Sequence, residues 1–267
     1  MKNRFSAIGL TAVLALAATS AQAQSSFSIG PRLGLNLSSF SYEYSNIPLG
    51  LANEATSIAG VQVGGTLNVG FGKFAFQPSL IFSQKGTEFR FSAEDKTNPP
   101  YTTTVTYTAK PKLHYLEMPL NVVYSASGDH GFQLFAGPYI AFGVGGSGTS
   151  TLAINSTDPN VVTSGAVNSF PISLAIEYGD RQNANQELEN SLNAGLNSTP
   201  RLIATFRRFD AGLNAGVGYR IGPYQVQVGY GLGLVNIAPN DTDGTSTGGK
   251  IYNRNFQLTA NYFFSTK

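Results

Sequence analysis

The stretch YQVQVGYGL, residues 224–232, alternates without interruption between two kinds of side chain. One parity is apolar or aromatic and comprises Tyr224, Val226, Val228, Tyr230 and Leu232. The other parity is polar or small and comprises Gln225, Gln227, Gly229 and Gly231. Alternation with a period of two predicts a β-strand that presents one apolar face.

Seven other stretches of the chain alternate in the same way. They are residues 27–37, 61–71, 74–83, 116–124, 132–142, 208–219 and 255–264. Each is about as long as a tilted strand that crosses a bilayer, roughly 9–11 residues. Because lipid cannot satisfy an unpaired backbone group, such strands must close into a barrel. The sequence therefore predicts an all-β fold: an eight-stranded, antiparallel, up-and-down transmembrane β-barrel.

The connections between these stretches alternate between short and long. The short ones are residues 72–73, 125–131 and 221–223, and the long ones are about 41–57, 91–104, 145–205 and 238–250. Short periplasmic turns and long outer loops are typical of outer-membrane barrels, and an even strand number places both termini in the periplasm. We therefore expect residues 146–205 to be a long extracellular loop.

Every stretch carries an aromatic residue on its apolar parity at the end next to a short turn. These residues are Phe27, Phe71, Phe74, Tyr124, Phe132, Tyr219, Tyr224 and Phe264. Aromatic side chains at one level of all eight strands predict a periplasmic girdle at the lipid–water interface. A soluble β-sandwich or a lipocalin-like barrel also has alternating strands, but neither requires this common level.

Residues 1–23 have the organisation of a signal peptide. Lys2 and Arg4 precede an apolar run over residues 7–18, and Ala21-Gln22-Ala23 supplies a cleavage pattern of small residues. The run is shorter than the roughly 20 residues of a transmembrane helix, which argues against the alternative of a membrane anchor. We expect export, cleavage before Gln24, a barrel domain over residues 24–267, and a final location in the bacterial outer membrane.

Composition excludes several classes of function. Charged residues make up only 12% of the chain, about half the usual share of a soluble domain. Loss of Lys2 and Arg4 would leave 15 basic against 15 acidic residues, which argues against binding to nucleic acid. The absence of cysteine excludes disulfides, thiolate metal sites, a cysteine nucleophile and a lipid-modified cysteine.

Several short segments resemble the PorT-like "porin family" of outer-membrane β-barrel proteins, which is common in Bacteroidota. The segments are FQPSLIFSQKG (76–86), YLEMPL (115–120), FAGPY (135–139), DAGL (210–213) and YGLGLVNI (230–237). The resemblance covers nearly all of the chain after the signal peptide. It implies an outer-membrane barrel but no single activity, and one departure from it is the length of residues 145–205.

Five charged residues fall on or near the parity that faces the lumen: Arg32, Lys85, Glu117, Arg208 and Asp210. A barrel of eight strands is filled by its own side chains, and buried charges are normally paired. We therefore expect a structural charge network, with Lys85 or Arg32 beside Glu117. An ion path or a proton-coupled site is the alternative interpretation.

No motif in the chain predicts catalysis, a cofactor or a metal. His114 and Glu117 have opposite parity, so a strand would place them on opposite sides of the wall. GVGGSG (143–148) matches a dinucleotide fingerprint in letters only, because no helix is expected after it. DTDG (241–244) lacks the remaining ligands of a calcium loop.

The long connection offers the best candidate for recognition. Residues 170–178 alternate and are expected to extend the neighbouring strands above the membrane, while Leu188, Leu192 and Leu196 predict a short amphipathic helix within residues 180–197. We expect a monomeric, non-enzymatic protein that contacts outer-membrane lipid and acts in surface interaction or envelope integrity, with these leucines as candidate contacts for an extracellular ligand or protein. A small-solute pore, a lipid-modifying enzyme and a subunit of a secretion machine remain alternatives.

Overall fold

The computed structural model describes residues 26–44, 52–163, 168–182 and 201–265, and most of them lie in β-strands. The strands are β1 (Ser26–Tyr44), β2 (Ala52–Phe71), β3 (Phe74–Asp95), β4 (Thr103–Ser125), β5 (His130–Ser156), β6 (Ser169–Tyr178), β7 (Arg201–Phe206), β8 (Phe209–Ile221), β9 (Tyr224–Gly233), β10 (Gly249–Tyr262) and β11 (Phe264–Ser265). One short helix, α2 (Pro159–Thr163), follows β5. Among the described residues, no helix is both long and apolar enough to span a membrane, a result that does not bear on β-barrels.

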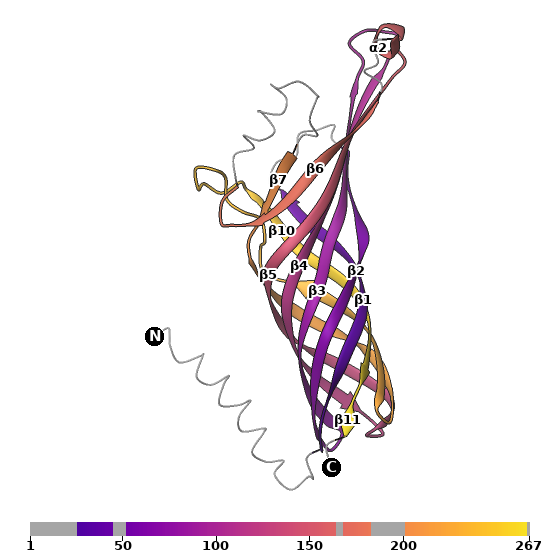
Figure 1. Cartoon of the computed structure of the whole chain (residues 1–267), viewed down its shortest axis with the longest axis vertical. Helices are drawn as coiled ribbons and strands as arrows, with labels where there is room; N and C mark the ends of the chain where they lie inside the picture. The colour runs from indigo at the N-terminus through magenta and orange to yellow at the C-terminus, as the bar shows by residue number, and fades with distance from the viewer. Residues whose placement is uncertain (1–25, 45–51, 164–167, 183–200, 266–267) are drawn as a thin grey trace.

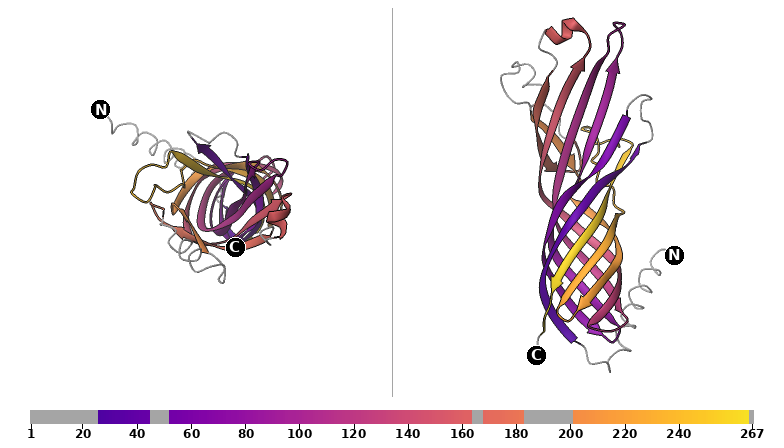
Figure 2. Two further views of the ribbon diagram at one scale, coloured as in Figure 1. Left: turned by 90° about the horizontal axis from the view of Figure 1, so that it is seen from above. Right: turned by 90° about the vertical axis from the view of Figure 1, so that its right-hand side faces the viewer.

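Eight of these strands close into a ring, as the alternation predicted. The order β4-β3-β2-β1-β10-β9-β8-β5 is antiparallel throughout, and β5 pairs with β4 to complete the circle. Figure 1 shows the tilted strands from the side, and Figure 2 shows the ring from above. Closure leaves no free strand edge within the barrel wall.

The two faces of the wall invert the pattern of a soluble protein. Leu33 and Val217 point outward with 60% and 53% of their surfaces exposed, whereas Asn36 and Gln225 point inward with 0% and 1% exposed. An exposed apolar exterior around a buried polar interior is the arrangement that a lipid environment requires. We call the ring of outward apolar side chains the lipid belt.

The two ends of the barrel differ in their connections. The short turns after β2, β4 and β8 lie at one end, together with Ser26 and Ser265, and we call this the turn end. Gly72 and Gly222 adopt φ values of +63° and +56° in two of these turns, a conformation that glycine tolerates best. The opposite end, where the long connections leave the barrel, is the loop end.

The loop end contains far more strand than the sequence predicted. Much of the segment expected to be a long extracellular loop, residues 146–205, is strand, because β5 continues to Ser156 and residues 169–178 and 201–206 form β6 and β7. β6 pairs antiparallel with β5, as the alternation of residues 170–178 predicted, and β7 then pairs parallel with β6. Half of residues 91–104 are also strand, since β3 runs to Asp95 and β4 begins at Thr103.

The barrel wall is much taller on one side than on the other. β5 has 27 residues and β4 has 23, whereas β9 has only 10. The upper parts of β3, β4, β5 and β6 therefore rise together above the rest of the ring, as Figure 2 shows from the side. We call residues 86–95, 103–112, 146–156 and 169–174 the projecting sheet.

Two predicted features lie outside the described residues. They are the signal peptide over residues 1–23 and the leucine stripe of Leu188, Leu192 and Leu196.

Candidate functional site

The aromatic residues next to the short turns lie together on the outer wall. Phe74 stands between Phe71 and Tyr124, with ring centroids 6.4 Å and 5.2 Å away, and Phe132 contacts Tyr219 at 5.0 Å. Tyr262, which the sequence reasoning did not include, lies between Tyr224 and Phe264 at 5.1 Å and 5.0 Å. Phe27 is likewise outward, with 49% of its surface exposed. All eight residues of the expected girdle thus lie at the turn end.

Three of the charged residues on the lumen parity form one buried cluster. The Lys85 ammonium lies 2.7 Å from a carboxylate oxygen of Glu117 and 3.7 Å from one of Asp210. All three side chains are at most 2% exposed. Asn253 and Tyr139 donate hydrogen bonds to the same Asp210 oxygen over 2.9 Å and 3.2 Å. This cluster joins β3, β4, β5, β8 and β10 across the lumen.

The other two predicted members of the charge network differ in position. Arg32 is 2% exposed and points into the lumen, where its Nε atom has no hydrogen-bond partner. Arg208 is exposed, so its assignment to the lumen was wrong. The error arises because β8 begins at Phe209, and Arg208 lies in a bend where strand parity does not apply.

Below this cluster, toward the turn end, amides fill the lumen. Gln62 bonds to Asn36 and donates to Gln257 over 3.1 Å, while Gln225 donates to Gln133 over 2.6 Å and accepts from Asn261 over 3.1 Å. Because each amide carries both donors and acceptors, a ladder of amides can fill the interior without net charge. The described part of the lumen is thus filled by amides that bond to one another.

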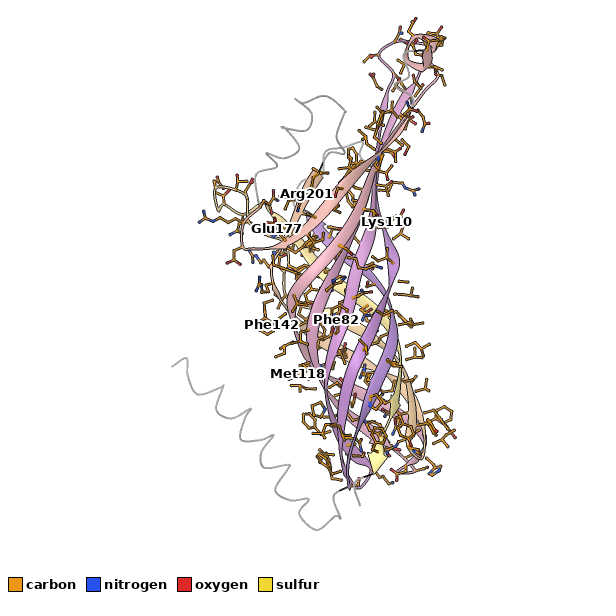
Figure 3. The ribbon with its side chains drawn as sticks, in the orientation of Figure 1. Phe82, Lys110, Met118, Phe142, Glu177 and Arg201 are labelled. Carbon is orange, nitrogen blue, oxygen red and sulfur yellow. The ribbon has the colours of Figure 1, made fainter. Side chains whose placement is uncertain are left out.

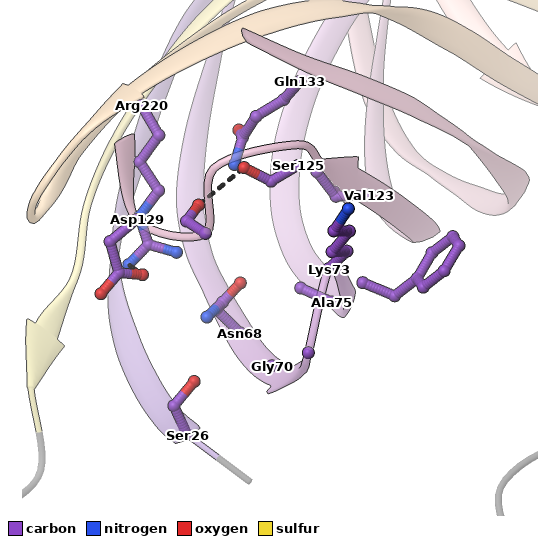
Figure 4. A pocket seen from close by; sticks show the side chains of 13 residues that line it. Ser26, Asn68, Gly70, Lys73, Ala75, Val123, Ser125, Asp129, Gln133 and Arg220 are labelled. Atoms are coloured by element: carbon purple, nitrogen blue, oxygen red, sulfur yellow. Dashed lines mark hydrogen bonds and ion pairs between the residues drawn. The ribbon is translucent and has the colours of Figure 1, made fainter. Parts of the chain in front are cut away.

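A small pocket lies at the turn end. Figure 4 shows the small pocket there, which has a volume of about 40 Å³ and includes Arg220 and Asp129 in its lining. Arg220 lies 3.6 Å from Asp129 and 5.0 Å from the ring of Phe263. A cavity of this size holds one or two waters but no organic substrate.

At the loop end an apolar layer covers the charged cluster. We call it the apolar cap, and its members are Phe40, Leu113, Tyr115, Tyr139, Ala141, Phe206 and Ile237. The ring of Phe206, the last residue of β7, lies 5.7 Å from that of Phe40 on β1. β7, most of which belongs to the segment expected to be a long loop, thus packs against β1 at the loop end.

Glycines in β5 allow β6 to lie close against the wall. A Cβ atom at Gly143 would lie 2.2 Å from the Tyr178 ring, and one at Gly146 would lie 2.7 Å from Ile176. The Tyr178 hydroxyl donates to the carbonyl of Gly145 over 3.0 Å. The glycine-rich segment 143–148 is thus the surface against which β6 packs, and it is followed by further strand rather than by a helix.

The projecting sheet has one apolar face, which continues the lumen side of the wall. Its side chains are Phe89, Phe91, Val105, Tyr107, Leu152, Ile154, Phe170 and Ile172. All eight are only partly buried, and Phe89 contacts Tyr42 of β1 at 5.9 Å between ring centroids. Pairing of Phe91 with Tyr107, and of Tyr107 with Leu152, places them side by side across three strands.

The opposite face of the projecting sheet is polar. Thr104, Thr106, Thr108 and Lys110 alternate along β4, and the Lys110 ammonium lies 2.8 Å from Glu88. This hydrogen bond lowers the pKa of the Glu88 carboxyl below its usual value. Figure 3 shows Lys110 well above Phe82 and Met118, which belong to the lipid belt. The sheet is therefore amphipathic outside the membrane-spanning part of the chain.

The closed ring, the lipid belt and the girdle define an outer-membrane barrel, and a family comparison agrees. Residues 21–239 match the model of the outer membrane protein beta-barrel domain. The chain belongs to this family. Membership places this β-barrel protein in the bacterial outer membrane.

Solved structures of similar fold include outer-membrane barrels from other bacteria. Ail of Yersinia pestis, in complex with the heparin analogue sucrose octasulfate, shares 10% identity, with 90% of this chain and 99% of Ail covered and a TM-score of 0.31. Neisserial surface protein A shares 8%, with coverage of 88% and 97% and a TM-score of 0.33. The NanC porin shares 8%, with coverage of 89% and 98% and a TM-score of 0.24. Scores this low support no argument about function, and no curated protein matches the chain in sequence.

In this family member, His114 and Glu117, which were considered for catalysis, lie on opposite sides of the barrel wall. Gln84 Nε2 lies 3.4 Å from His114 Nε2 on the outer wall, whereas Glu117 is buried in the lumen. Asp243 of the calcium-like segment accepts hydrogen bonds from the backbone and side chain of Thr245. Among the described residues no three His, Cys, Asp or Glu side chains form a metal-binding group.

Sequence reasoning missed the apolar cap and the apolar face of the projecting sheet. Tyr115 and Tyr139 lie on the polar parity of their strands, so the pattern gave no reason to join them with Phe206. The alternation of residues 170–178 was the one available signal, since it already predicted strand in this segment.

Proposed function

We propose that this barrel is closed and non-enzymatic, and that it binds an extracellular protein through the apolar face of the projecting sheet. The observation that carries the proposal is a row of partly exposed aromatic and aliphatic side chains on strands that continue beyond the lipid belt. The polar face opposite needs no partner, whereas the apolar face gains free energy when it is covered. Aromatic residues are also enriched where binding energy concentrates in protein interfaces.

The sealed lumen argues against a pore for small solutes. A solute would have to displace the apolar cap, the Lys85–Glu117–Asp210 cluster and the amide layers in turn. Buried charges and amides that bond to one another stabilise the barrel rather than line a path. A planar-bilayer recording on the refolded protein should show no steady conductance, and a large steady conductance would refute the closed barrel.

The absence of a catalytic role is likewise a proposal, and it rests on geometry. His114 faces Gln84 and the ring of Phe82 on the outer wall, with ring centroids 5.4 Å apart. General-base chemistry needs a nucleophile within hydrogen-bond reach of the base. Neither of these neighbours is a nucleophile that His114 could activate.

We further propose that the loop end faces outward and that both termini are periplasmic. Short turns at the end that carries the termini support this orientation. The eight strands leave no barrel edge to pair with a second copy, which supports a monomer. The PorT-like resemblance of residues 76–86 and 115–120 is compatible with a machine subunit, in which case the sheet would bind another envelope protein.

Site-specific photocrosslinking in the native cells tests the docking face. A photoreactive amino acid at Ile154 samples the apolar face, and one at Thr151 samples the polar face of the same strand. We expect a discrete crosslinked product from Ile154 and none from Thr151. No product at either position, or equal products at both, would overturn the proposal, and a product that contains an envelope protein would instead favour the machine subunit.

Placing a charge on the apolar face provides a second test. Phe91→Asp should abolish the crosslink from Ile154, whereas Arg90→Asp on the opposite face should leave it unchanged. Both variants must first show the shift in gel mobility on boiling that distinguishes a folded barrel. An unchanged crosslink in Phe91→Asp would show that the apolar face does not hold the partner.

A further inference from the structure

Three cations lie at the upper edge of the lipid belt. Just above the last apolar residues of their strands, Lys112 and Arg254 face outward, and the exposed Arg208 directly precedes β8. These three cations form no salt bridge within the described residues, whereas Lys110 and Lys250, farther along β4 and β10, pair with Glu88 and Glu43. Lys112, Arg208 and Arg254 therefore carry positive charge that no salt bridge among the described residues neutralises.

Arg254 is the cation that the barrel holds most firmly. Its Nη1 atom donates to the carbonyl of Gly233 over 2.8 Å and to that of Asn253 over 3.0 Å, and its guanidinium lies 5.6 Å from the Tyr252 ring. These contacts fix the direction of the side chain, and no carboxylate in the described part of the chain forms a salt bridge with it. A guanidinium oriented in this way is suited to phosphate, which it binds with short, charge-assisted hydrogen bonds.

A groove of about 290 Å³ lies beside Arg254 on the outer wall. Its lining residues are Leu37, Ser39, Ser57, Tyr230, Arg254, Asn255 and Phe256. Strand register places Ser39 opposite Arg254, Leu37 opposite Phe256, and Phe256 opposite Tyr230.

The sizes of the lining side chains explain why a groove forms here. Ser39 and Ser57 are small, while Leu37, Tyr230 and Phe256 are large outward side chains that are 42–57% exposed. The large side chains form walls and the serines leave the space between them. The cation thus borders the polar part of the groove, and the apolar walls extend into the lipid belt.

We propose that this groove binds an anionic phosphorylated lipid of the surrounding membrane, with the phosphate at Arg254 and an acyl chain against Leu37, Tyr230 and Phe256. Charge complementarity selects the phosphate, and the apolar walls select a lipid over free phosphate. Lys112 and Arg208 add a general attraction for anionic headgroups around the belt. This site is independent of the projecting sheet and rests only on the membrane location.

The site can be tested with lipid A as the phosphorylated lipid. The full-length protein, refolded into phosphatidylcholine vesicles with or without lipid A, is extracted in detergent and analysed by native mass spectrometry for retained lipid. We expect wild type to retain lipid A in preference to phosphatidylcholine, and Arg254→Gln to lower the apparent affinity for lipid A about tenfold, as the loss of a charge-assisted contact predicts. Arg254→Lys should recover part of the affinity.

Matched variants distinguish binding in the groove from a general electrostatic attraction for anionic lipid. Ser39→Phe fills the groove but keeps Arg254, and it should also lose lipid A; this variant serves if Arg254→Gln does not fold. Lys96→Gln removes an exposed cation whose salt-bridge partner is Glu94, and it should retain lipid A fully. Lys112→Gln should have a smaller effect than Arg254→Gln.

Several results would overturn the proposal. They are equal retention of lipid A by wild type and Arg254→Gln, equal retention of phosphatidylcholine by wild type, or equal losses in the Lys112 and Arg254 variants. Displacement of lipid A by inorganic phosphate would also overturn it, because it would make the site an anion site without a role for the groove. A failure of this site would leave the projecting sheet proposal untouched, since none of the residues that line the groove belongs to the projecting sheet.

Discussion

The buried salt bridge between Lys85 and Glu117 gives the sharpest stability prediction. Glu117→Gln removes one of the two buried carboxylates, Glu117 and Asp210, that balance the buried cations Lys85 and Arg32 in this part of the lumen. The variant leaves one uncompensated positive charge in a packed interior. Loss of one member of a buried pair costs about 3–5 kcal/mol. Because Asp210 remains 3.7 Å from Lys85, we expect the lower end of this range, about 3 kcal/mol.

A double-mutant cycle distinguishes the effect of an unpaired buried charge from the effect of losing one side chain. In Lys85→Met combined with Glu117→Gln, the lumen is again neutral, so the free energy of unfolding should lie within about 1 kcal/mol of wild type. Glu94→Gln is the matched control. Glu94 also lies 2.7 Å from a lysine, Lys96, but both are exposed, and the change should cost less than about 0.5 kcal/mol.

The assay is equilibrium unfolding in urea after refolding into lipid vesicles. Tyrosine fluorescence can follow the transition because the chain has 13 tyrosines and no tryptophan. A double variant that is no more stable than Glu117→Gln alone would refute the reasoning, since it would show that unpaired charge is not the cause of the loss.

Three other predictions concern the wall, the cap and the orientation. Val228→Arg, in the middle of the lipid belt, should cost about 2–4 kcal/mol in the same unfolding assay, whereas Tyr224→Arg at the girdle should cost about 1 kcal/mol or less; equal costs would contradict the assigned depths. Gly143→Val should push β6 away from β5, lower the free energy of unfolding by about 1–3 kcal/mol and raise protease cleavage within residues 169–178. Unchanged cleavage would show that β6 does not pack closely against Gly143. In the cysteine-free chain, Lys96→Cys should react with an impermeant maleimide in intact cells and Lys73→Cys only after disruption; the reverse result would invert the orientation.

The barrel could be predicted because its physical requirement is local. Lipid outside and a polar interior impose alternation on every strand, so residues 224–232 alone reveal both faces. The same reasoning placed Lys85, Glu117 and Asp210 on the lumen parity, since each lies within a regular strand. It failed for Arg208, which lies one residue before β8, where side-chain direction no longer follows a period of two.

The loop end could not be predicted in the same way, because its structure depends on contacts between distant segments. Whether residues 146–156 form loop or strand depends on β4 and β6, which pair with them on either side, and β6 also covers Gly143 and Gly146 with Tyr178 and Ile176. Neither glycine carries a side chain that could signal this contact in the sequence. A glycine-rich segment after a strand suggests an exit into a loop, and only the partner strand shows that it continues.

The additional length of some strands links the barrel to the projecting sheet. A barrel that served only to cross the membrane would need about 9–11 residues in every strand, and β9 with 10 residues has that length. β5 has 27 residues, and its additional length pairs with β4 on one side and with β6 on the other. β6 then leads through β7 to Phe206, which completes the apolar cap. The element that closes the lumen and the element that extends the surface are therefore one continuous sheet, so a change that loosens β6 should affect both closure and binding.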